Sequence, residues 1–457
     1  MIAIFDIGKT NKKLFLFDEN YNIVWERACI CEQTVDEDGE PCEDLARLDA
    51  FLQESLAAIP MDAQPRAINF SAYGASFVYI GSDGRPVAPL YSYLKPFPDK
   101  LKQKFYGSYG GEAGFSLLTA SPVLGSLNSG MQLYRIKEQR PQLFEKIQTA
   151  LHLPQYLSYL FTGTPCSDIT GIGCHTNLWD FSRQQYHEWV YREGIIDKLA
   201  PILPSASVLP VVNTPVPSST TAPVSHAFTS PAPVSPTPTT LLTPRIPIAG
   251  IGLHDSSAAL IPYLETFPEP FLLISTGTWC ISMNPFDHSP LTLPELQKDS
   301  LCYISYQGKP VKASRLFAGY EHEQEVQHLA AKFDVQPAAA ATVAYDPITI
   351  HQLRTNPQRD PTTFAQAYHR LMLDIMKEQV ASTQLVLHDT PVRRIFVDGG
   401  FGKNQLYMHL LAEAFPDIAV FTASIPQASA IGAALAIHEH WNSRPRPEHI
   451  IELRNYK

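Results

Sequence analysis

The same short pattern, a strand followed by a polar turn and a second strand, occurs near the start of this 457-residue chain and again in its second half. Near the start, an apolar run over 2–5 leads into the turn Asp6-Ile-Gly-Lys-Thr-Asn11 and a second run that ends at Phe17. In the second half, an apolar run over 271–274 leads into Ser275-Thr-Gly-Thr278 and a further run over 279–283. Apolar runs joined by short Gly/Thr/Asn turns are typical of β-hairpins. We therefore predict two related α/β domains with a cleft between them.

An uncharged, proline-rich stretch separates the two predicted domains. Residues 199–244 contain no Asp, Glu, Lys or Arg, and residues 201–247 hold 12 of the 39 prolines. Proline removes a backbone donor and fixes φ, so such a stretch is poor material for helices and inner strands. We interpret it as a linker or surface insertion, with a segment that docks a partner as the alternative. The predicted domains are residues 1–245 and 246–457.

Charge and cysteine content narrow the classes of function. The chain has 35 Lys and Arg against 45 Asp and Glu, a net charge of -10, which provides no broad basic surface for nucleic acid. No apolar run is long enough for a membrane span, and the first residues do not resemble a signal peptide, so we expect a cytoplasmic monomer or homodimer without a membrane partner. The seven cysteines show no paired CxxC spacing, so neither a disulfide framework nor a zinc site is predicted.

The first polar turn contains the groups that a phosphate needs. Gly8 allows backbone N–H groups to approach an oxyanion, Thr10 and Asn11 add donors, and Lys12 or Lys13 adds positive charge. The turn around Gly277 and Thr278 offers similar donors without the cation. Each turn taken alone is equally compatible with a plain hairpin.

Two further segments carry candidate chemistry. Asp255 precedes Ser256 and small residues that suit the start of a helix, so it is either a helix cap or a general base near a cleft. The segment Asp398-Gly-Gly-Phe-Gly-Lys-Asn404 joins a predicted strand to a predicted helix. Its glycines either admit a nucleotide base or only allow a tight turn.

In their order and spacing these four segments resemble the motifs of the FGGY carbohydrate kinases. The resemblance implies an actin-like fold of two ribonuclease-H-like domains, with the nucleotide and sugar bound in the cleft. It implies ATP and Mg²⁺ as cofactors and Asp255 as the catalytic base, with Asp6 holding the metal. The implied ATP contacts are Gly8, Thr10, Asn11, Lys13, Gly277, Thr278, Gly399, Gly400 and Asn404.

The segment over 70–80 and the His254-Asp255 pair are similar to those of rhamnulokinases and L-fuculokinases within that family. The implied sugar contacts are Tyr73, Gly74, His254, Asp255 and Ser256. Lys9 departs from the family pattern, which usually has threonine there. We expect transfer of the γ-phosphate of ATP to the C1 hydroxyl of a ketose, with L-rhamnulose first and L-fuculose or another pentulose or hexulose as alternatives. An actin-like ATPase that uses no sugar is the alternative from a different class.

Overall fold

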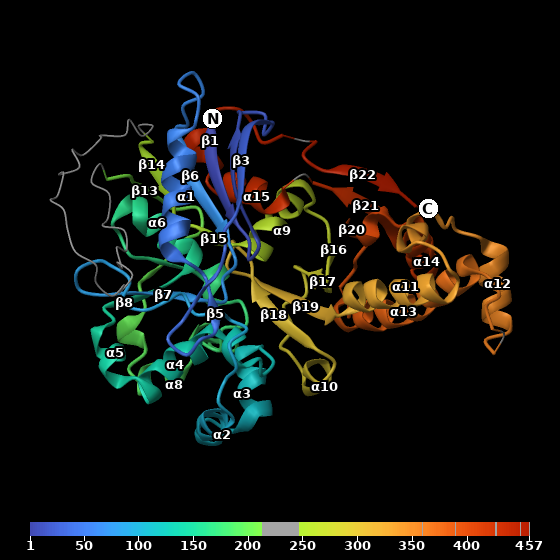
Figure 1. Ribbon diagram of the computed structural model, residues 1–457, viewed down its shortest axis with the longest axis horizontal. Helices are drawn as coiled ribbons and strands as arrows, with labels where there is room; N and C mark the ends of the chain where they lie inside the picture. The colour runs from blue at the N-terminus through green and yellow to red at the C-terminus, as the bar shows by residue number, and fades with distance from the viewer. Residues whose placement is uncertain (213–245, 359, 389, 426, 448, 457) are drawn as a thin grey trace, which may run out of the picture.

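The structure is a computed structural model that describes residues 1–212, 246–358, 360–388, 390–425, 427–447 and 449–456. Two mixed β-sheets dominate it, one built mainly from the first half of the chain and one from the second (Figure 1). The central part of the proline-rich stretch, residues 213–245, lies outside the described residues, so its prediction as a linker is untested there. Short strands lie on both sides of this segment, at residues 202–203 and 208–210 before it and at residues 248–250 after it.

The first sheet has the strand order β13-β14-β6-β1-β2-β3, with β15 also paired to β6. Strands β1, β2 and β3 form the predicted antiparallel meander, and β6 runs parallel to β1 after a crossover through helix α1. β1 is buried along almost its whole length because helices cover both faces of the sheet. The strands are β1 (Ile2–Ile7), β2 (Asn11–Phe17), β3 (Ile23–Ile30), β6 (Ala67–Ala72), β13 (Val208–Pro210), β14 (Ile248–Gly250) and β15 (Leu253–His254).

The second sheet repeats this topology. Its order is β18-β19-β17-β16-β20-β21-β22, in which β16, β17 and β19 are antiparallel, β20 and β21 run parallel to β16, and β22 is antiparallel to β21. The duplication predicted from the two hairpins is therefore confirmed. The strands are β16 (Phe271–Thr276), β17 (Cys280–Asn284), β18 (Ser300–Ile304), β19 (Pro310–Leu316), β20 (Arg394–Gly399), β21 (Ala419–Ser424) and β22 (Glu452–Asn455).

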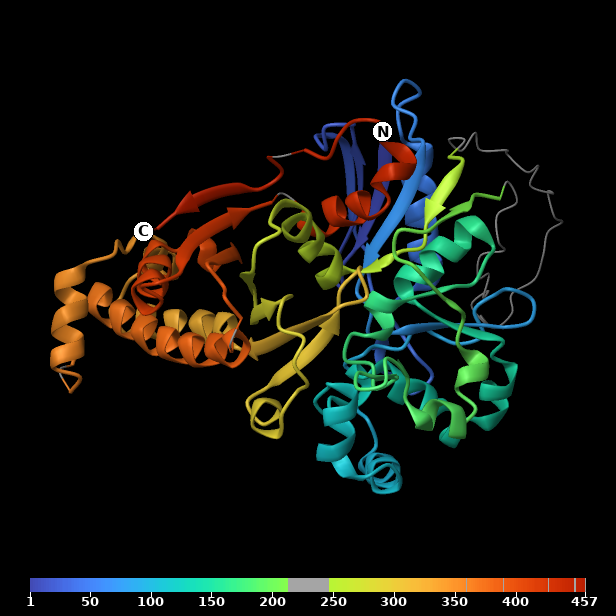
Figure 2. The ribbon, with the colours of Figure 1, turned by 180° about the vertical axis from the view of Figure 1, so that it is seen from behind.

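Helices α9 (Asp255–Thr266) and α15 (Ala428–Ala436) pack against each other between the two sheets, as seen from both sides in Figures 1 and 2. A Cβ on Gly432 of α15 would lie 1.8 Å from the carbonyl oxygen of Ala258, so this close crossing requires glycine. The apolar core around these helices includes Ile4 of the first sheet and Phe396 of the second. The two domains therefore share a continuous core beside the cleft.

The remaining large helices cover the outer faces of the sheets. Helices α1 and α6 pack on the first sheet, and α13 and α14 pack on the second. A separate helical region joined to the first sheet has its own aromatic core around Phe105 and Trp189. The helices here are α1 (Leu45–Ala57), α2 (Asp99–Ser108), α3 (Gly111–Thr119), α4 (Ser129–Gln139), α5 (Pro141–Lys146), α6 (Leu153–Thr162), α8 (Glu188–Arg192), α11 (Ala318–Lys332), α12 (Pro347–Thr355), α13 (Phe364–Leu387) and α14 (Gln405–Ala414).

Short elements complete the fold. Single-turn helices are α7 (Ile169–Ile172), α10 (Leu293–Leu296) and α16 (His438–Trp441), and 3₁₀ turns cover Gly125–Leu127, Ile196–Lys198, Pro337–Thr342 and Phe401–Lys403. Two-stranded ribbons are β4 (Thr34–Val35) with β5 (Pro41–Cys42), β7 (Phe77–Ile80) with β8 (Thr149–His152), β9 (Ser167–Asp168) with β12 (Ile202–Leu203), and β10 (Trp179–Asp180) with β11 (Gln185–Tyr186). No helix in the described ranges combines the length and apolar character of a membrane span.

The predicted division between residues 245 and 246 falls before β14 and β15, which pair with β6. The chain therefore completes the first sheet before it enters the second domain at Asp255.

Candidate active site

Asp6 lies near the carboxyl end of β1, one residue before the strand ends. Its register partners are Lys13 on β2 and Ser71 on β6, and its Oδ2 accepts a hydrogen bond of 3.0 Å from Ser429 of α15. Burial raises the pKa of Asp6 to about 6, and the negative charge of Asp255 adds to this shift. The two carboxylates, 249 residues apart in sequence, therefore influence each other electrostatically.

The turn after β1 separates the two lysines that follow it. The N–H of Gly8 donates to the carbonyl of Asn11 at 2.9 Å, which closes the turn and leaves Thr10 and Asn11 exposed at its tip. Lys12 is fully buried beneath the turn, where its ammonium group binds the carbonyl of Gly8 at 2.9 Å and the carboxylate of Glu43 at 2.9 Å.

Lys13 lies on the opposite face of β2, because successive side chains alternate along a strand. It pairs with Asp6 across the hairpin and is only half-buried. Of the two lysines, only Lys13 is therefore partly exposed.

Asp255 begins helix α9, and its carboxylate side chain is 36% exposed. Its Oδ1 accepts the backbone N–H of Ser256 at 2.6 Å. Position at a helix N-terminus favours negative charge. The site thus has an accessible carboxylate, as a proton acceptor needs, which sits close enough to Asp6 to raise its pKa.

His254 connects Asp255 to the predicted sugar wall. Its Nε2 lies 3.5 Å from Oδ1 of Asp255, and burial lowers the pKa of its imidazole. A Cβ added to Gly74 would lie 2.4 Å from Cδ2 of His254, so the absence of a side chain at Gly74 makes room for the ring. The hydroxyl of Tyr73 donates to Glu43 at 3.2 Å. Gly74, His254 and Asp255 therefore lie side by side, with Tyr73 next to Gly74 in the chain.

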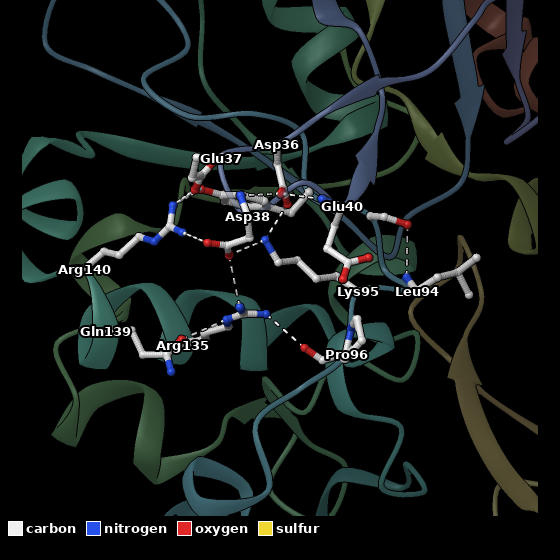
Figure 3. Close-up of polar contacts among 12 residues, drawn as sticks. Asp36, Glu37, Asp38, Glu40, Leu94, Lys95, Pro96, Arg135, Gln139 and Arg140 are labelled. Atoms are coloured by element: carbon white, nitrogen blue, oxygen red, sulfur yellow. Dashed lines mark hydrogen bonds and ion pairs between the residues drawn. The ribbon is translucent and has the colours of Figure 1, made fainter.

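Glu43 contacts both the turn after β1, through Lys12, and the candidate sugar wall, through Tyr73. A network of ion pairs holds the loop that precedes Glu43. In this loop, Asp36 pairs with Lys95, and Asp38 pairs with Lys95 at 2.7 Å (Figure 3). Asp38 also meets Arg140 at 2.8 Å and Arg135 at 3.4 Å. The loop is thus tied to helix α4 and to the segment before α2, and it holds Glu43 under Lys12.

Lys9 lies beside the candidate sugar wall, and no contact was assigned to it from the sequence. Its ammonium group lies 5.7 Å from the ring centroid of Tyr73 and 5.5 Å from that of Tyr93. This ammonium group makes no hydrogen bond or ion pair within the described part of the chain. Tyr93 is in turn close enough to Asp255 for the carboxylate charge to contribute, after burial, to raising the tyrosine pKa. The only feature of the sequence that could have pointed to Lys9 is its departure from the threonine that the family usually has there.

The second polar turn is tied directly to the glycine-rich segment over 398–404. Gly400 donates its N–H to the carbonyl of Thr276 at 3.0 Å, and the N–H of Phe401 donates to the Thr276 hydroxyl at 3.0 Å. A Cβ on Gly399, where φ is +88°, would lie 1.8 Å from the Thr276 carbonyl oxygen. Gly277 and Thr278 remain exposed at the tip of the turn. The two segments therefore form one surface.

A cavity of about 620 Å³ opens beside this surface, lined in part by Gly400, Asn404 and Tyr368. Asn404 caps α14 by accepting the N–H of Tyr407 at 3.1 Å, and its amide donates to the hydroxyl of Tyr368 at 2.7 Å. The same hydroxyl lies 3.0 Å from His322. Asn404 thus both caps α14 and lines a cavity large enough for a nucleotide.

The residues present fit the cofactors that the motifs imply. Carboxylate oxygens such as those of Asp6 are the ligands that Mg²⁺ prefers, and a divalent cation would offset the mutual repulsion of Asp6 and Asp255. Exposed backbone at Gly277, Gly399 and Gly400 leaves room for phosphates and a base.

Comparison with known families agrees with this geometry. Residues 1–225 match the N-terminal domain of the FGGY family of carbohydrate kinases, and residues 268–445 match the C-terminal domain of carbohydrate kinase FGGY. The chain belongs to the FGGY family of carbohydrate kinases.

Curated relatives are distant. A rhamnulokinase from Halalkalibacterium halodurans is 23% identical over 183 residues, which cover 38% of this chain and 39% of the relative. A rhamnulokinase from Mannheimia succiniciproducens is 24% identical over 201 residues, 40% of each chain. The chain thus matches about two fifths of the length of these relatives.

Solved structures share the fold over nearly the whole chain. A carbohydrate kinase from Novosphingobium aromaticivorans has a TM-score of 0.79 at 22% identity, over 99% of this chain and 95% of that one. A xylulose kinase from Rhodospirillum rubrum has a TM-score of 0.77 at 15% identity, over 99% and 92%. The predicted fold of two ribonuclease-H-like, actin-like domains is confirmed.

Proposed function

We propose that this chain is an ATP-dependent kinase of a ketose, with the C1 hydroxyl of L-rhamnulose as the first candidate acceptor. The observation that carries the proposal is the position of Asp255. Its accessible carboxylate stands between the sugar wall formed by Tyr73, Gly74 and His254 and the end of β1 that holds Asp6. A group in that position can accept the proton of a hydroxyl as the hydroxyl attacks a phosphoryl group.

The other site residues have complementary roles in this proposal. The phosphates of ATP would lie between the turn around Gly8 and the turn around Gly277, with Lys13 supplying positive charge to the transferred group. The adenosine would occupy the cavity lined by Gly400 and Asn404. Mg²⁺, when bound, would neutralise phosphate charge, and Asp6 would hold it directly or through water.

L-rhamnulose stands first because the curated relatives are named rhamnulokinases and because the aromatic-glycine segment at Tyr73 and Gly74 lies against His254. L-fuculose and other pentuloses or hexuloses are the alternatives within the family. The alternative from another class is an actin-like ATPase that uses no sugar. A wall of Tyr73 and His254 beside Asp255 favours a sugar acceptor over water, which needs no such wall.

The test is coupled ADP release with Mg-ATP across L-rhamnulose, L-fuculose, L-ribulose, D-xylulose and their parent aldoses. We expect one ketose to stimulate ADP release strongly over the rate without sugar. Steady ADP release that no sugar changes would instead support the ATPase alternative.

The role of Asp255 is tested by Asp255→Asn against a matched control, Asp99→Asn. Asp99 is also the first residue of a helix, α2, but lies in the separate helical region. Loss of a general base typically costs about 10²–10⁴-fold in rate, so we expect that loss for Asp255→Asn and none for Asp99→Asn. Near-full sugar phosphorylation by a folded Asp255→Asn protein would overturn the assignment.

A further inference from the structure

Three side chains with metal-binding atoms meet directly behind the candidate sugar wall. Cys174 and His175 follow helix α7, and His254 ends strand β15. One ligand atom from each of the three lies within 4.8 Å of the other two. Cys174 is 2% exposed and His254 is 6% exposed, whereas His175 is partly exposed.

Two buried imidazole nitrogens of this cluster, Nδ1 of His175 and Nδ1 of His254, have no hydrogen-bond partner among the described residues. Buried polar groups are normally satisfied, so these two nitrogens beside a buried thiol are available to a metal ion.

The backbone holds the three side chains in place. His175 has a φ of +42°, a conformation that non-glycine residues rarely adopt, and its carbonyl is fixed by the side-chain amide of Asn128 at 2.7 Å. The N–H of His254 donates to the hydroxyl of Thr170 in α7 at 3.1 Å, which joins the two segments. The segments therefore meet through defined contacts.

We propose that Cys174, His175 and His254 bind a thiophilic divalent cation of the zinc class. One sulfur and two imidazole nitrogens are ligands that zinc prefers and magnesium does not. In a tetrahedral zinc site, bond lengths of about 2.0–2.3 Å place neighbouring ligand atoms roughly 3.3–3.6 Å apart. The cluster would therefore close by about 1 Å on binding, and Cys174 would release its proton to solvent.

The local charges allow this binding. Asp255, whose Oδ1 lies 3.5 Å from Nε2 of His254, adds negative charge beside the cluster. Arg315 adds positive charge nearby, but its guanidinium pairs with Asp299 at 2.6 Å and lies 5.2 Å from the ring centroid of Trp279. Since His254 contacts both Gly74 and Asp255, an ion here would fix a sugar-wall residue and inhibit the kinase; this consequence alone rests on the proposed function.

The binding test uses the untagged full chain under reducing conditions, by equilibrium dialysis against micromolar ZnCl₂ and by titration with Co²⁺. We expect one zinc per chain and a thiolate-to-cobalt charge-transfer absorption. Cys174→Ala should abolish that absorption, and His175→Gln should weaken zinc binding at least tenfold. Cys302→Ala, which removes another buried thiol, should change neither.

Three results would overturn the proposal. These are the absence of zinc uptake by the folded chain, uptake that Cys174→Ala and His175→Gln leave unchanged, and uptake lost in Cys31→Ser. The last would place the ion at Cys29 and Cys31, whose sulfurs lie 3.6 Å apart. If the His175→Gln variant does not fold, the zinc and cobalt binding of Cys174→Ala tests the proposal. If Cys174→Ala does not fold, His175→Gln tests it.

Inhibition is measured separately, with Mg-ATP in excess. Zinc should reduce the rate of sugar-stimulated ADP release, and the factor of this reduction should be at least ten times larger for the wild-type chain than for His175→Gln. Because dialysis and cobalt absorption require no kinase activity, failure of the proposed function would leave the binding result intact.

Discussion

The substitution Gly74→Ala tests whether His254 must lie where the structure places it. The added Cβ would be 2.4 Å from Cδ2 of His254, whereas carbon atoms in ordinary contact are about 3.5–4.0 Å apart. The ring must therefore move by about 1 Å or more. The φ of Gly74 lies outside the positive range, so alanine fits the backbone and the effect is on the neighbour.

The expected cost follows from that displacement. A misplacement of about 1 Å in a positioning group costs on the order of 10²-fold in rate, equivalent to about 2.7 kcal/mol. We expect kcat/KM for the preferred ketose to fall by about that factor, while the KM for ATP stays within twofold. The candidate nucleotide cavity is lined by residues of the second domain, so ATP binding should be unaffected by the change. Coupled ADP release with separate sugar and ATP titrations measures both quantities.

Two controls separate this mechanism from a loss of folding. Gly107→Ala in α2 adds a Cβ with nothing within 4 Å and should leave activity unchanged, with thermal unfolding measured for both variants. In a double-mutant cycle, Gly74→Ala should cost little in a His254→Ala background, because the displaced ring is gone. An equal cost in both backgrounds, or wild-type activity of Gly74→Ala, would refute the reasoning.

Three further substitutions address the first domain. Burial raises the pKa of Asp6 to about 6, so the native state holds this proton more tightly than the unfolded chain, and stability falls as pH rises from about 4 to 6. Asp6→Asn should remove this pH dependence of stability. In urea unfolding without Mg²⁺ at pH 7, the variant should be more stable than wild type by up to about 3 kcal/mol. Equal or lower stability of the variant at pH 7 contradicts this prediction. Lys12→Met leaves Glu43 as an unpaired buried charge and should destabilise the protein by about 3–5 kcal/mol in chemical denaturation, with partial recovery in Lys12→Met/Glu43→Gln. Lys9→Met should raise the KM for the sugar about tenfold or more and leave the KM for ATP unchanged, because the ammonium group of Lys9 faces the candidate sugar wall. Lys100→Met, at an exposed lysine, is the control. An equal effect of the two substitutions argues against a role for Lys9.

Local sequence pattern was sufficient for the duplicated architecture. Strand periodicity and turn residues act over a few neighbouring positions, so the hairpins at β1–β2 and β16–β17 could be predicted, and the order of four motifs indicated the family. Asp255 could likewise be placed at a helix start, because the small residues after it suit a helix N-terminus. These properties depend on short segments, which a single sequence displays directly.

Long-range placement was decided only by the tertiary structure. Alternation along β2 separates Lys12 from Lys13, but only packing against Glu43 decides which of them is buried. The return of residues 248–254 to the first sheet depends on pairing with β6, which no local pattern encodes.

The cluster behind the sugar wall gives the same lesson most strongly. Cysteine spacing predicted no zinc site, since no CxxC pair exists, yet residues almost eighty positions apart meet where α7 is hydrogen-bonded to β15. The sequence alone determined which elements form and in which order they follow one another. The tertiary structure decided which side chains meet, because closing long loops brings together residues that share no local pattern.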